Sequence, residues 1–416
     1  MRRPMIGLGA NWDFLRLWAA QTVSFVGSQV TLVALPLTAV LSLQASPAQM
    51  GMLRAVELAP ALLIGLVAGA WVDRVRRRPI LIVADIGRAL LLGAVPLAAY
   101  LGILAIGQLY AVAFLVGILT VFFDVAHLSL LPALVPADRL IEGNSKLEVS
   151  RSVAMVAGPG LAGLLVQLVT APLAIAVDAL SFLGSALFLL RIRTPEQAPA
   201  VSSRRRSILA DVADGLRAVW GQPLLRAMAL SLCVFNLFYS MVGAVYVLFV
   251  VRELHLTPGV LGLIYAVGSL GFLLGATFAS RAARRWGVGP TIVWGAGVSD
   301  AAFLLVPLAG GASAAAAAIL IAAQMLATVG GPMTAINQLS LRQTITPAHI
   351  LGRVNATMRV ISLGAAPLGA LLAGGIGGLL GLRPALAIGA LGLQLGFLVL
   401  LLSPLRTMRT NPAIGS

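Results

Sequence analysis

The segment LSLLPALVPADRLIEGN, residues 128–144, returns in altered form as LSLRQTITPAHILGRVN, residues 339–355. Seven of the seventeen aligned positions are identical, and the offset of 211 residues is close to half of the 416-residue chain. Three further pairs keep nearly the same offset: Arg151 and Arg359, Pro159 and Pro367, and Pro172 and Pro384. The chain is therefore predicted to consist of two homologous halves.

Composition identifies the class of each half. Apolar residues make up 59% of the chain and charged residues 10%, with a mean hydropathy of +0.99, against about 45–50% and about 25% in soluble domains. Apolar runs long enough to cross a bilayer occur six times in each half. The predicted spans are 15–43, 50–72, 80–100, 106–127, 148–168 and 172–190, then 224–251, 258–280, 290–308, 314–338, 357–380 and 384–403.

These spans predict an all-α polytopic membrane protein with twelve transmembrane helices in two pseudo-symmetric six-helix bundles, residues 1–190 and 224–416. Residues 191–223 form the predicted linker on the inner side. It opens with a Pro- and Ser-containing stretch and three arginines, and its residues 208–220 have the apolar spacing of an amphipathic helix lying on the inner leaflet.

The distribution of positive charge predicts the orientation. The chain has 29 Lys and Arg against 14 Asp and Glu, and 25 of those basic residues fall in segments on one side of the predicted membrane. The positive-inside rule makes that side cytoplasmic and places both termini there, in a bacterial inner membrane. Nucleic-acid binding is not expected, because binders concentrate charge on a polar domain. Cys233, the single cysteine, excludes an internal disulfide.

The loop after the second span carries the first candidate motif, GAWVDRVRRRP, residues 69–79. Gly69 would allow close helix approach, and Asp73 could face a helix N-terminus and pair with arginines such as Arg74, Arg77 and Arg78. That arrangement would latch the two halves together on the inner side. The alternative interpretation is an ordinary basic loop. The equivalent stretch of the second half has Ala279 where the Asp would be.

The fifth span carries a second motif, AMVAGPGLAG, residues 154–163. Gly158, Pro159 and Gly163 give this helix a kinked, small-residue face. Such a face can pack tightly against a neighbouring helix and limit leakage. Ordinary helix packing would require the same residues.

Together these motifs resemble the major facilitator superfamily, in particular its drug:proton antiporter branch with the macrolide-efflux and enterobactin-exporter proteins. The first motif is similar to the family signature, except that Arg76 occupies a position that is usually small. The second is similar to the antiporter Gly-Pro motif with two Ala replacements, and residues 131–144 and 177–183 look like the same subgroup. The resemblance implies the family's fold and favours export. No arginine occurs from Ile106 to His127, where the drug-exporter branch often has one.

Ionisable residues inside the spans are the candidate proton carriers, since buried charge is costly and usually functional. The candidates are Glu57, Asp124, Asp178 and Asp300. Each has a structural alternative: Glu57 could pair with Arg54, Asp124 with His127, Asp178 could bond a neighbouring helix, and Asp300 could cap a helix break. Asp85 and Arg88, one turn apart, can form a self-neutralising pair.

The first and seventh spans supply the candidate substrate cavity, because these spans face each other across the repeat in the fold that the resemblance implies. Their amide, aromatic and thioether side chains suit a bulky, partly polar guest, although interior packing is the alternative for each. They are Gln21, Phe25, Gln29, Asn236, Phe238, Tyr239 and Met241.

The predicted function is therefore secondary active export of small amphipathic molecules, drug-like or siderophore-like, by alternating access and coupled to protons. The alternatives are a facilitator or exchanger of lysolipids or metabolites, and a non-transporting sensor or assembly subunit. No nucleotide-binding fingerprint, metal-ligand pattern or catalytic constellation is present in the sequence. We therefore expect no enzyme activity and no cofactor. The expected partners are a small-molecule substrate, protons and membrane lipid, and the protein is expected to be a monomer.

Overall fold

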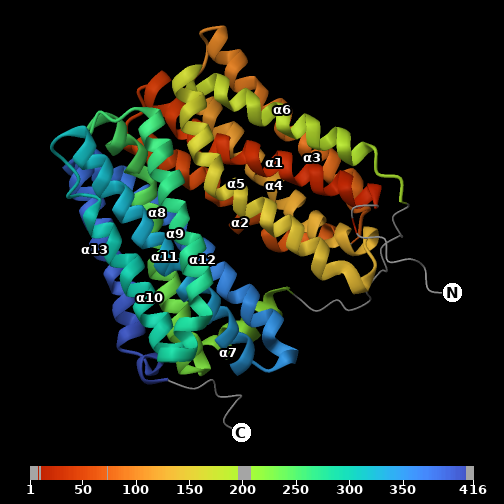
Figure 1. Cartoon of the computed structure of the whole chain (residues 1–416), viewed down its shortest axis with the longest axis vertical. Coiled ribbons are helices and arrows are strands. Elements are labelled where there is room, and N and C mark those ends of the chain that lie inside the picture. The colour runs from red at the N-terminus through yellow and green to blue at the C-terminus, as the bar shows by residue number, and fades with distance from the viewer. Residues whose placement is uncertain (1–7, 9–10, 73, 195–207, 409–416) are drawn as a thin grey trace. The chain divides into compact units, whose positions relative to one another are not determined.

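The computed structural model describes residues 8, 11–72, 74–194 and 208–408, without the side chains at 66, 67, 70, 128, 129 and 208–212. Every regular element in this part of the chain is helical (Figure 1). This agrees with the predicted all-α class, since a backbone in lipid has to satisfy its hydrogen bonds within its own segment.

The first half contains α1 Trp12–Leu37, α2 Pro47–Val72, α3 Arg77–Tyr100, α4 Ile106–Leu134, α5 Leu140–Leu168 and α6 Ala171–Leu190. A π-helical turn, Thr38–Ser42, continues α1. The linker contains α7 Ile208–Gly221. The second half contains α8 Pro223–Arg252, α9 Pro258–Trp286, α10 Val288–Ala302, α11 Ser313–Ile345, α12 Ala348–Leu380 and α13 Leu382–Leu401.

Each of the twelve predicted spans corresponds to one of these helices, with α7 as the additional amphipathic one. Eleven of them are long and apolar enough to cross a membrane within the described residues, and the remaining one, α2, has 26 residues. Two pairs of consecutive helices are separated by a single glycine with a positive φ. Gly287 (φ 97°) alone separates α9 from α10, and Gly381 (φ 95°) alone separates α12 from α13, a backbone region that favours glycine.

The repeated segments 128–144 and 339–355 adopt the same local structure, a helix, a turn at a proline and a second helix. The turns lie at Pro136 and Pro347, because proline cannot continue the preceding helix. As a result α4, α5, α11 and α12 are longer than predicted; α5, for example, begins at Leu140 and not at 148. Hydropathy marks only the part of a helix that lies in lipid, so it missed these polar extensions.

The chain divides into two compact units, unit 1 with Met1–Ala45 and Val56–Ser202, and unit 2 with Ser46–Ala55 and Ser203–Ser416. The first turns of α2 thus pack within unit 2, where Gly51 meets α12. A Cβ on Gly51 would lie 2.8 Å from the Cα of Gly374. The bundle boundaries at 190 and 224 stay predictions.

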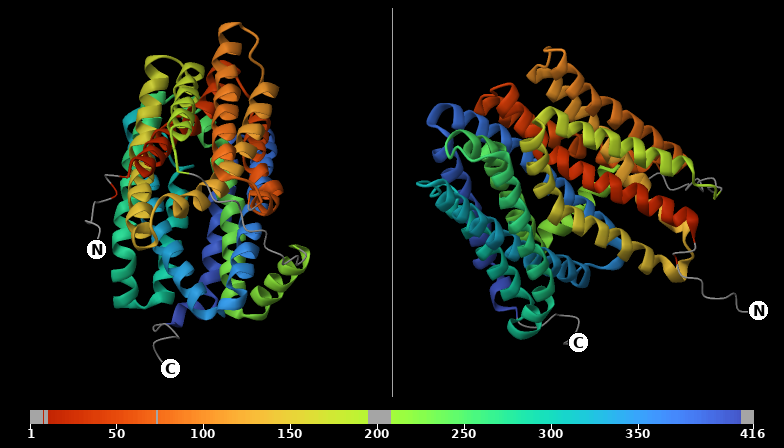
Figure 2. Two further views of the ribbon diagram at one scale, coloured as in Figure 1. Left: turned by 90° about the vertical axis from the view of Figure 1, so that its right-hand side faces the viewer. Right: turned by 45° about the horizontal axis from the view of Figure 1, so that its top comes forward.

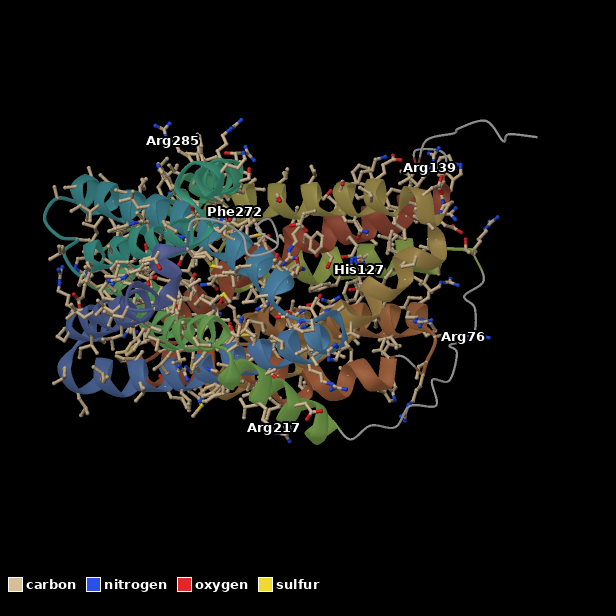
Figure 3. All side chains as sticks on the ribbon, turned by 90° about the horizontal axis from the view of Figure 1, so that it is seen from below. Arg76, His127, Arg139, Arg217, Phe272 and Arg285 are labelled. Atoms are coloured by element: carbon tan, nitrogen blue, oxygen red, sulfur yellow. The ribbon has the colours of Figure 1, made fainter. Side chains whose placement is uncertain are left out.

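In unit 1, α6 lies alongside α1 and α3, α5 packs against α1, and α4 against α3 (Figure 1 and Figure 2). The contact of α1 with α6 depends on Gly27, where a Cβ would lie 2.5 Å from Oδ1 of Asp178. Arg76 and Arg139 lie at the same end of this unit (Figure 3), which we call the arginine-rich end of unit 1. Its core includes the fully buried Phe14, Leu17 and Leu81.

In unit 2, α11 packs against α9 and α10, and α8 packs against α12 and α13. Glycines again set the closest approaches, because apolar helices in lipid associate through small residues. A Cβ on Gly275 of α9 would lie 2.9 Å from the carbonyl carbon of Val329 in α11. At Gly369 of α12, a Cβ would lie 2.7 Å from the carbonyl carbon of Leu237 in α8.

Helix α7 is docked on α12 within unit 2. Asp214 accepts hydrogen bonds from Arg353 of α12 at 3.2 Å and from Arg217 at 3.1 Å, and Arg217 extends away from the bundle (Figure 3). Val219 is fully buried, whereas Leu216 and Trp220 are 44% and 48% exposed. The predicted amphipathic helix is therefore held by protein on one side and leaves two large apolar residues uncovered on another.

Substitution of Gly215 by Ala should loosen this docking. The new Cβ would lie 2.7 Å from the carbonyl oxygen of Arg353, and overpacking of this kind costs about 1–3 kcal/mol. We expect a lower thermal unfolding midpoint for the detergent-solubilised protein. Gly221→Ala is the matched control, because a Cβ there would meet no atom within 4 Å. Equal midpoints for the two variants would contradict the docking seen here.

Candidate functional site

A buried ion pair on α3 is the centre of the charged site in unit 1. Asp85 and Arg88 lie one turn apart, with Nη2 of Arg88 donating to Oδ1 of Asp85 at 2.5 Å, and their side chains are 0% and 3% exposed. The self-neutralising pair suggested by their spacing is present. The hydroxyl of Ser185 in α6 approaches the Asp85 carboxylate, and Nε of Arg88 has no hydrogen-bond partner among the described atoms.

Two aromatic rings enclose the guanidinium of Arg88. Its central carbon lies 4.2 Å from the ring centroid of Phe123 in α4 and 4.0 Å from that of Phe182 in α6. A desolvated cation between two ring faces gains about 2 kcal/mol or more from each such contact. The sandwich fixes the guanidinium plane and connects three helices around one charge.

Two further carboxylates, Asp124 of α4 and Asp178 of α6, are within electrostatic range of Arg88. Asp178 is buried and accepts a hydrogen bond from the Ser181 hydroxyl at 3.0 Å, and the hydroxyl of Thr31 in α1 approaches the same carboxylate. Asp124 is exposed. We call Asp85, Arg88, Asp124 and Asp178 the Arg88 cluster.

The Arg88 cluster has the composition of a site that can bind and release a proton. Its two buried carboxylates, Asp85 and Asp178, share the single guanidinium of Arg88, and a surplus of negative charge inside a membrane span is costly unless a proton or another cation reduces it. Ionisable groups in spans face the bundle interior or a water-filled cavity. A proton would therefore enter the cluster from solvent at the exposed Asp124, and Asp178 would be the enclosed proton-binding carboxylate.

The other two candidate proton carriers lie outside this cluster. Glu57 is a half-buried residue of α2, whose backbone carbonyl approaches Gly117 of α4. Asp300 is 2% exposed on α10, three residues before the α-helix becomes 3₁₀ at Phe303–Leu305. Nε2 of Gln394 in α13 donates to the backbone oxygen of Asp300 at 2.8 Å. This bond satisfies a backbone carbonyl beside the helix break and does not involve the Asp300 carboxylate, so both interpretations of that carboxylate stay predictions.

The basic motif of residues 69–79 has a structural role within unit 1. Arg78 donates to the carbonyl oxygens of Leu189 at 3.0 Å and Leu190 at 2.8 Å, so it satisfies the last carbonyls of α6. A Cβ on Gly69 would meet no described atom within 4 Å. Asp73 lies outside the described residues, so the latch it would form with Arg74 and Arg77 stays a prediction.

The Gly-Pro motif of α5 lies at a helix contact. Gly158, Pro159 and Gly163 are buried, and a Cβ on Gly158 would collide with the side chain of Gln29 in α1. The small-residue face therefore brings α1 against α5. Gln29 packs there and Phe25 is half-buried. Gln21 is 1% exposed, and its Nε2 has no hydrogen-bond partner among the described atoms.

The candidate cavity residues of α8 divide between two faces of that helix. Phe238 lies against Gly392 of α13, and Met241 is 1% exposed beside Gly389. The Asn236 amide donates to Leu232 of its own helix at 2.8 Å. Only Tyr239, 42% exposed, belongs to an open face. The structural alternative, interior packing, therefore accounts for Phe238 and Met241.

Aromatic residues that were not predicted surround Tyr239. Its ring stacks on Phe235 with centroids 5.2 Å apart and meets Phe303 edge-on at 5.6 Å. Tyr246, two turns farther along α8, lies 5.8 Å from Tyr265 of α9. We call these five residues the aromatic cluster of unit 2. The sequence showed only the spacing of Phe235, Tyr239 and Tyr246 along one helix. It could not show that Tyr265 and Phe303, on other elements, contact them.

The chain is similar to known membrane proteins over nearly its whole length. A family model described as transmembrane secretion effector matches residues 10–415. Multidrug efflux pump Tap of Mycolicibacterium fortuitum is 30% identical over 407 residues, which cover 95% of this chain and 96% of that protein. Macrolide efflux protein A of Streptococcus pyogenes is 24% identical over 272 residues, with coverage of 64% and 67%.

Solved transporter structures share the fold. A bacterial homologue of the iron transporter ferroportin in the inward-facing state has a TM-score of 0.74 at 17% identity, covering 94% of this chain and 98% of its own. The nucleoside transporter NupG has the same TM-score at 11% identity, with coverage of 94% and 98%. These likenesses confirm the predicted major facilitator fold.

Removal of one partner of the buried ion pair should lower the free energy of unfolding more than removal of both partners. Arg88→Gln leaves Asp85 unpaired, and breaking a buried pair costs about 3–5 kcal/mol. The double variant Asp85→Asn, Arg88→Gln should recover part of that loss, as measured by unfolding in mixed detergent and SDS. Lys146→Gln, which breaks the half-exposed pair with Glu142, should change stability by about 0–1 kcal/mol. An Arg88→Gln loss no larger than that of Lys146→Gln would refute a stabilising pair.

Proposed function

Because the chain belongs to the transmembrane secretion effector family of the major facilitator superfamily, it is a membrane transporter, and we propose that it exports small amphipathic molecules in exchange for protons. Transport would proceed by alternating access, with drug-like or siderophore-like compounds as substrates. The buried Arg88 cluster is the observation that carries the proposal.

The direction of transport is supported by the relatives. Both the pump of Mycolicibacterium fortuitum and the protein of Streptococcus pyogenes are efflux proteins by name, and the first is similar over 95% of this chain. The Gly158–Pro159 contact of α5 with α1 is consistent with the antiporter branch that the sequence resembles. Export is therefore the proposed direction.

Proton coupling is supported by the charge of the Arg88 cluster. A proton bound at Asp124 or Asp178 changes the number of carboxylates that compete for the Arg88 guanidinium. Since Asp124, Asp178 and Arg88 lie on α4, α6 and α3, that competition acts on the contacts of three helices. One charge crossing 100 mV provides about 2.3 kcal/mol, enough for a gradient of roughly 40-fold.

The substrate class is supported by the aromatic cluster of unit 2. Rings and phenol hydroxyls together suit a guest with both apolar and polar parts. Tyr239 is its exposed member and Tyr246 its most buried one.

The setting of the protein is also part of the proposal. The arginine distribution favours a bacterial inner membrane with both termini in the cytoplasm. The inner gate would be latched by the motif of Gly69, Asp73, Arg74 and Arg77, while Arg78 also caps α6. The transporter would act as a monomer.

Neutralisation of Asp178 should uncouple transport from the proton gradient. In proteoliposomes with an imposed gradient we expect wild-type protein to concentrate a substrate of the efflux class, and Asp178→Asn to reduce the accumulation ratio from up to about 40 to about 1. Substrate exchange without a gradient should persist, because the variant still binds. Glu142→Gln, at a half-exposed carboxylate of α5, is the matched control.

The rivals predict different results in the same vesicles. A facilitator or exchanger of lysolipids or metabolites equilibrates substrate without concentrating it, and wild-type flux is then insensitive to an uncoupler. A sensor or assembly subunit gives no flux. Full coupling in Asp178→Asn would instead remove that residue from the proton path.

Truncation of Tyr239 should weaken the binding of aromatic substrates. Aromatic pairs contribute about 0.5–1.5 kcal/mol each, so Tyr239→Ala should raise the transport KM about 2- to 12-fold. Tyr100→Ala is the control, because Tyr100 is 88% exposed at the end of α3. An unchanged KM across a compound panel would place the substrate elsewhere.

A further inference from the structure

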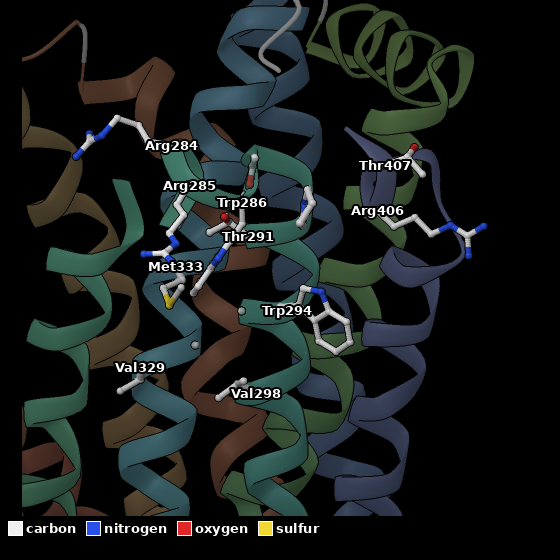
Figure 4. A pocket seen from close by; sticks show the side chains of 14 residues that line it. Arg284, Arg285, Trp286, Thr291, Trp294, Val298, Val329, Met333, Arg406 and Thr407 are labelled. Carbon is white, nitrogen blue, oxygen red and sulfur yellow. Dashed lines mark hydrogen bonds between the residues drawn. The ribbon is translucent and has the colours of Figure 1, made fainter. Parts of the chain in front are cut away.

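A pocket of about 1070 Å³ opens between α9 and α10 in unit 2 (Figure 4). Helices α9 and α10 both pack along α11 but contact each other little, so a groove remains between them with α11 as its floor. Val329, Gly330 and Met333 of α11 form that floor. Nothing in the proposed transport mechanism uses this pocket.

The pocket is lined by arginines from other elements near the start of α10 and by apolar residues farther along this helix. Thr291, Trp294 and Val298 follow one another on the pocket side of this helix, at the spacing of a single helical face. With a rise of 1.5 Å per residue, the face from Thr291 to Val298 spans about 10 Å. Val298 is 43% exposed, so the apolar part of the groove is open along its side.

Three arginines surround the charged end. Arg284 and Arg285 end α9, and Arg406 belongs to the 3₁₀ turn Pro404–Thr407. All three are exposed. In Figure 4 Arg285 extends toward Met333, while Arg284 and Arg406 extend to either side.

The described carboxylates of unit 2 lie elsewhere. Asp214 is bound to Arg353 and Arg217, Glu253 is bound to Arg383, and Asp300 is buried farther along α10. In this part of the chain no ion pair joins any of them to the three pocket arginines. The mouth therefore has an excess of positive charge that an anion can neutralise.

Two tryptophans indicate the depth of the pocket in the membrane. Trp286 and Trp294 are 59% and 62% exposed, and both line the pocket. Exposed indoles are enriched where the hydrocarbon meets the headgroup layer. The mouth of the pocket is thus expected at headgroup level and its floor in hydrocarbon.

We propose that this pocket binds one anionic phospholipid. The headgroup phosphate is held by Arg285, Arg284 and Arg406 add positive charge on either side of the mouth, and the upper acyl chain lies along Trp294 and Val298. Basic pockets between transmembrane helices recognise anionic headgroups in this way. A free phosphate ion would use the arginines but leave the apolar groove unfilled, so the lipid is the occupant to which both ends of the pocket are complementary.

Lipid preference of the purified full chain tests the proposal. Native mass spectrometry of protein titrated with phosphatidylglycerol or phosphatidylcholine should show one retained phosphatidylglycerol. Arg285→Gln together with Arg406→Gln should weaken its binding about 5-fold for each arginine removed. The matched control, Arg281→Gln with Arg226→Gln, removes the same charge from exposed residues of unit 2 outside the pocket and should bind like wild type.

A second measurement locates the lipid without altering the arginines. In nanodiscs, phosphatidylglycerol with brominated acyl chains should quench tryptophan fluorescence more than brominated phosphatidylcholine, and replacement of both Trp286 and Trp294 by Phe should remove that excess. The proposal is overturned if the control pair loses as much binding as the pocket pair, if the excess quenching survives in the variant without Trp286 and Trp294, or if millimolar inorganic phosphate displaces the lipid.

Discussion

Within a bilayer, a backbone amide finds no water to bond, so each span of this chain has to be a helix. The lipid is as apolar as the side chains, so burial of leucine provides little reason for one helix to contact another. The contacts that order each unit therefore depend on positions where a backbone can come close. Gly27 brings α1 to α6, Gly158 brings α1 to α5, and Gly275 brings α9 to α11. These contacts decide which polar groups can meet.

The Arg88 cluster follows from that packing. Three helices supply its four charged residues, the rings of Phe123 and Phe182 enclose Arg88, and Gly27 lets the Asp178 carboxylate lie against α1. In a low-dielectric interior, the charged residues of the Arg88 cluster are stable only when all of their partners are present. The proposed proton coupling would use this dependence. Gain or loss of one proton would change the electrostatic interactions of every helix that contributes a residue to the Arg88 cluster.

The two units share a scaffold but differ in chemistry. Both contain the helix, proline turn and helix of the repeated segment, at Pro136 and at Pro347. Unit 1 has enclosed charge around Arg88, whereas unit 2 has stacked rings around Tyr239 and a basic pocket beside α10. This division is consistent with a transporter in which one unit responds to protons and the other recognises the apolar part of a substrate.

The sequence alone predicted the helical class, the twelve long helices and the pairing of Asp85 with Arg88, because hydropathy and i,i+3 spacing are properties of one segment. It also indicated the family through its motifs. It could not extend α5 back to Leu140, since polar helical ends carry no hydropathy signal. Tertiary structure decided that Asp124, Asp178, Phe123 and Phe182 surround Arg88, and that Tyr265 and Phe303 join the α8 rings. Those contacts join different helices, and the rotation and neighbours of a helix are set by close packing that no single segment encodes.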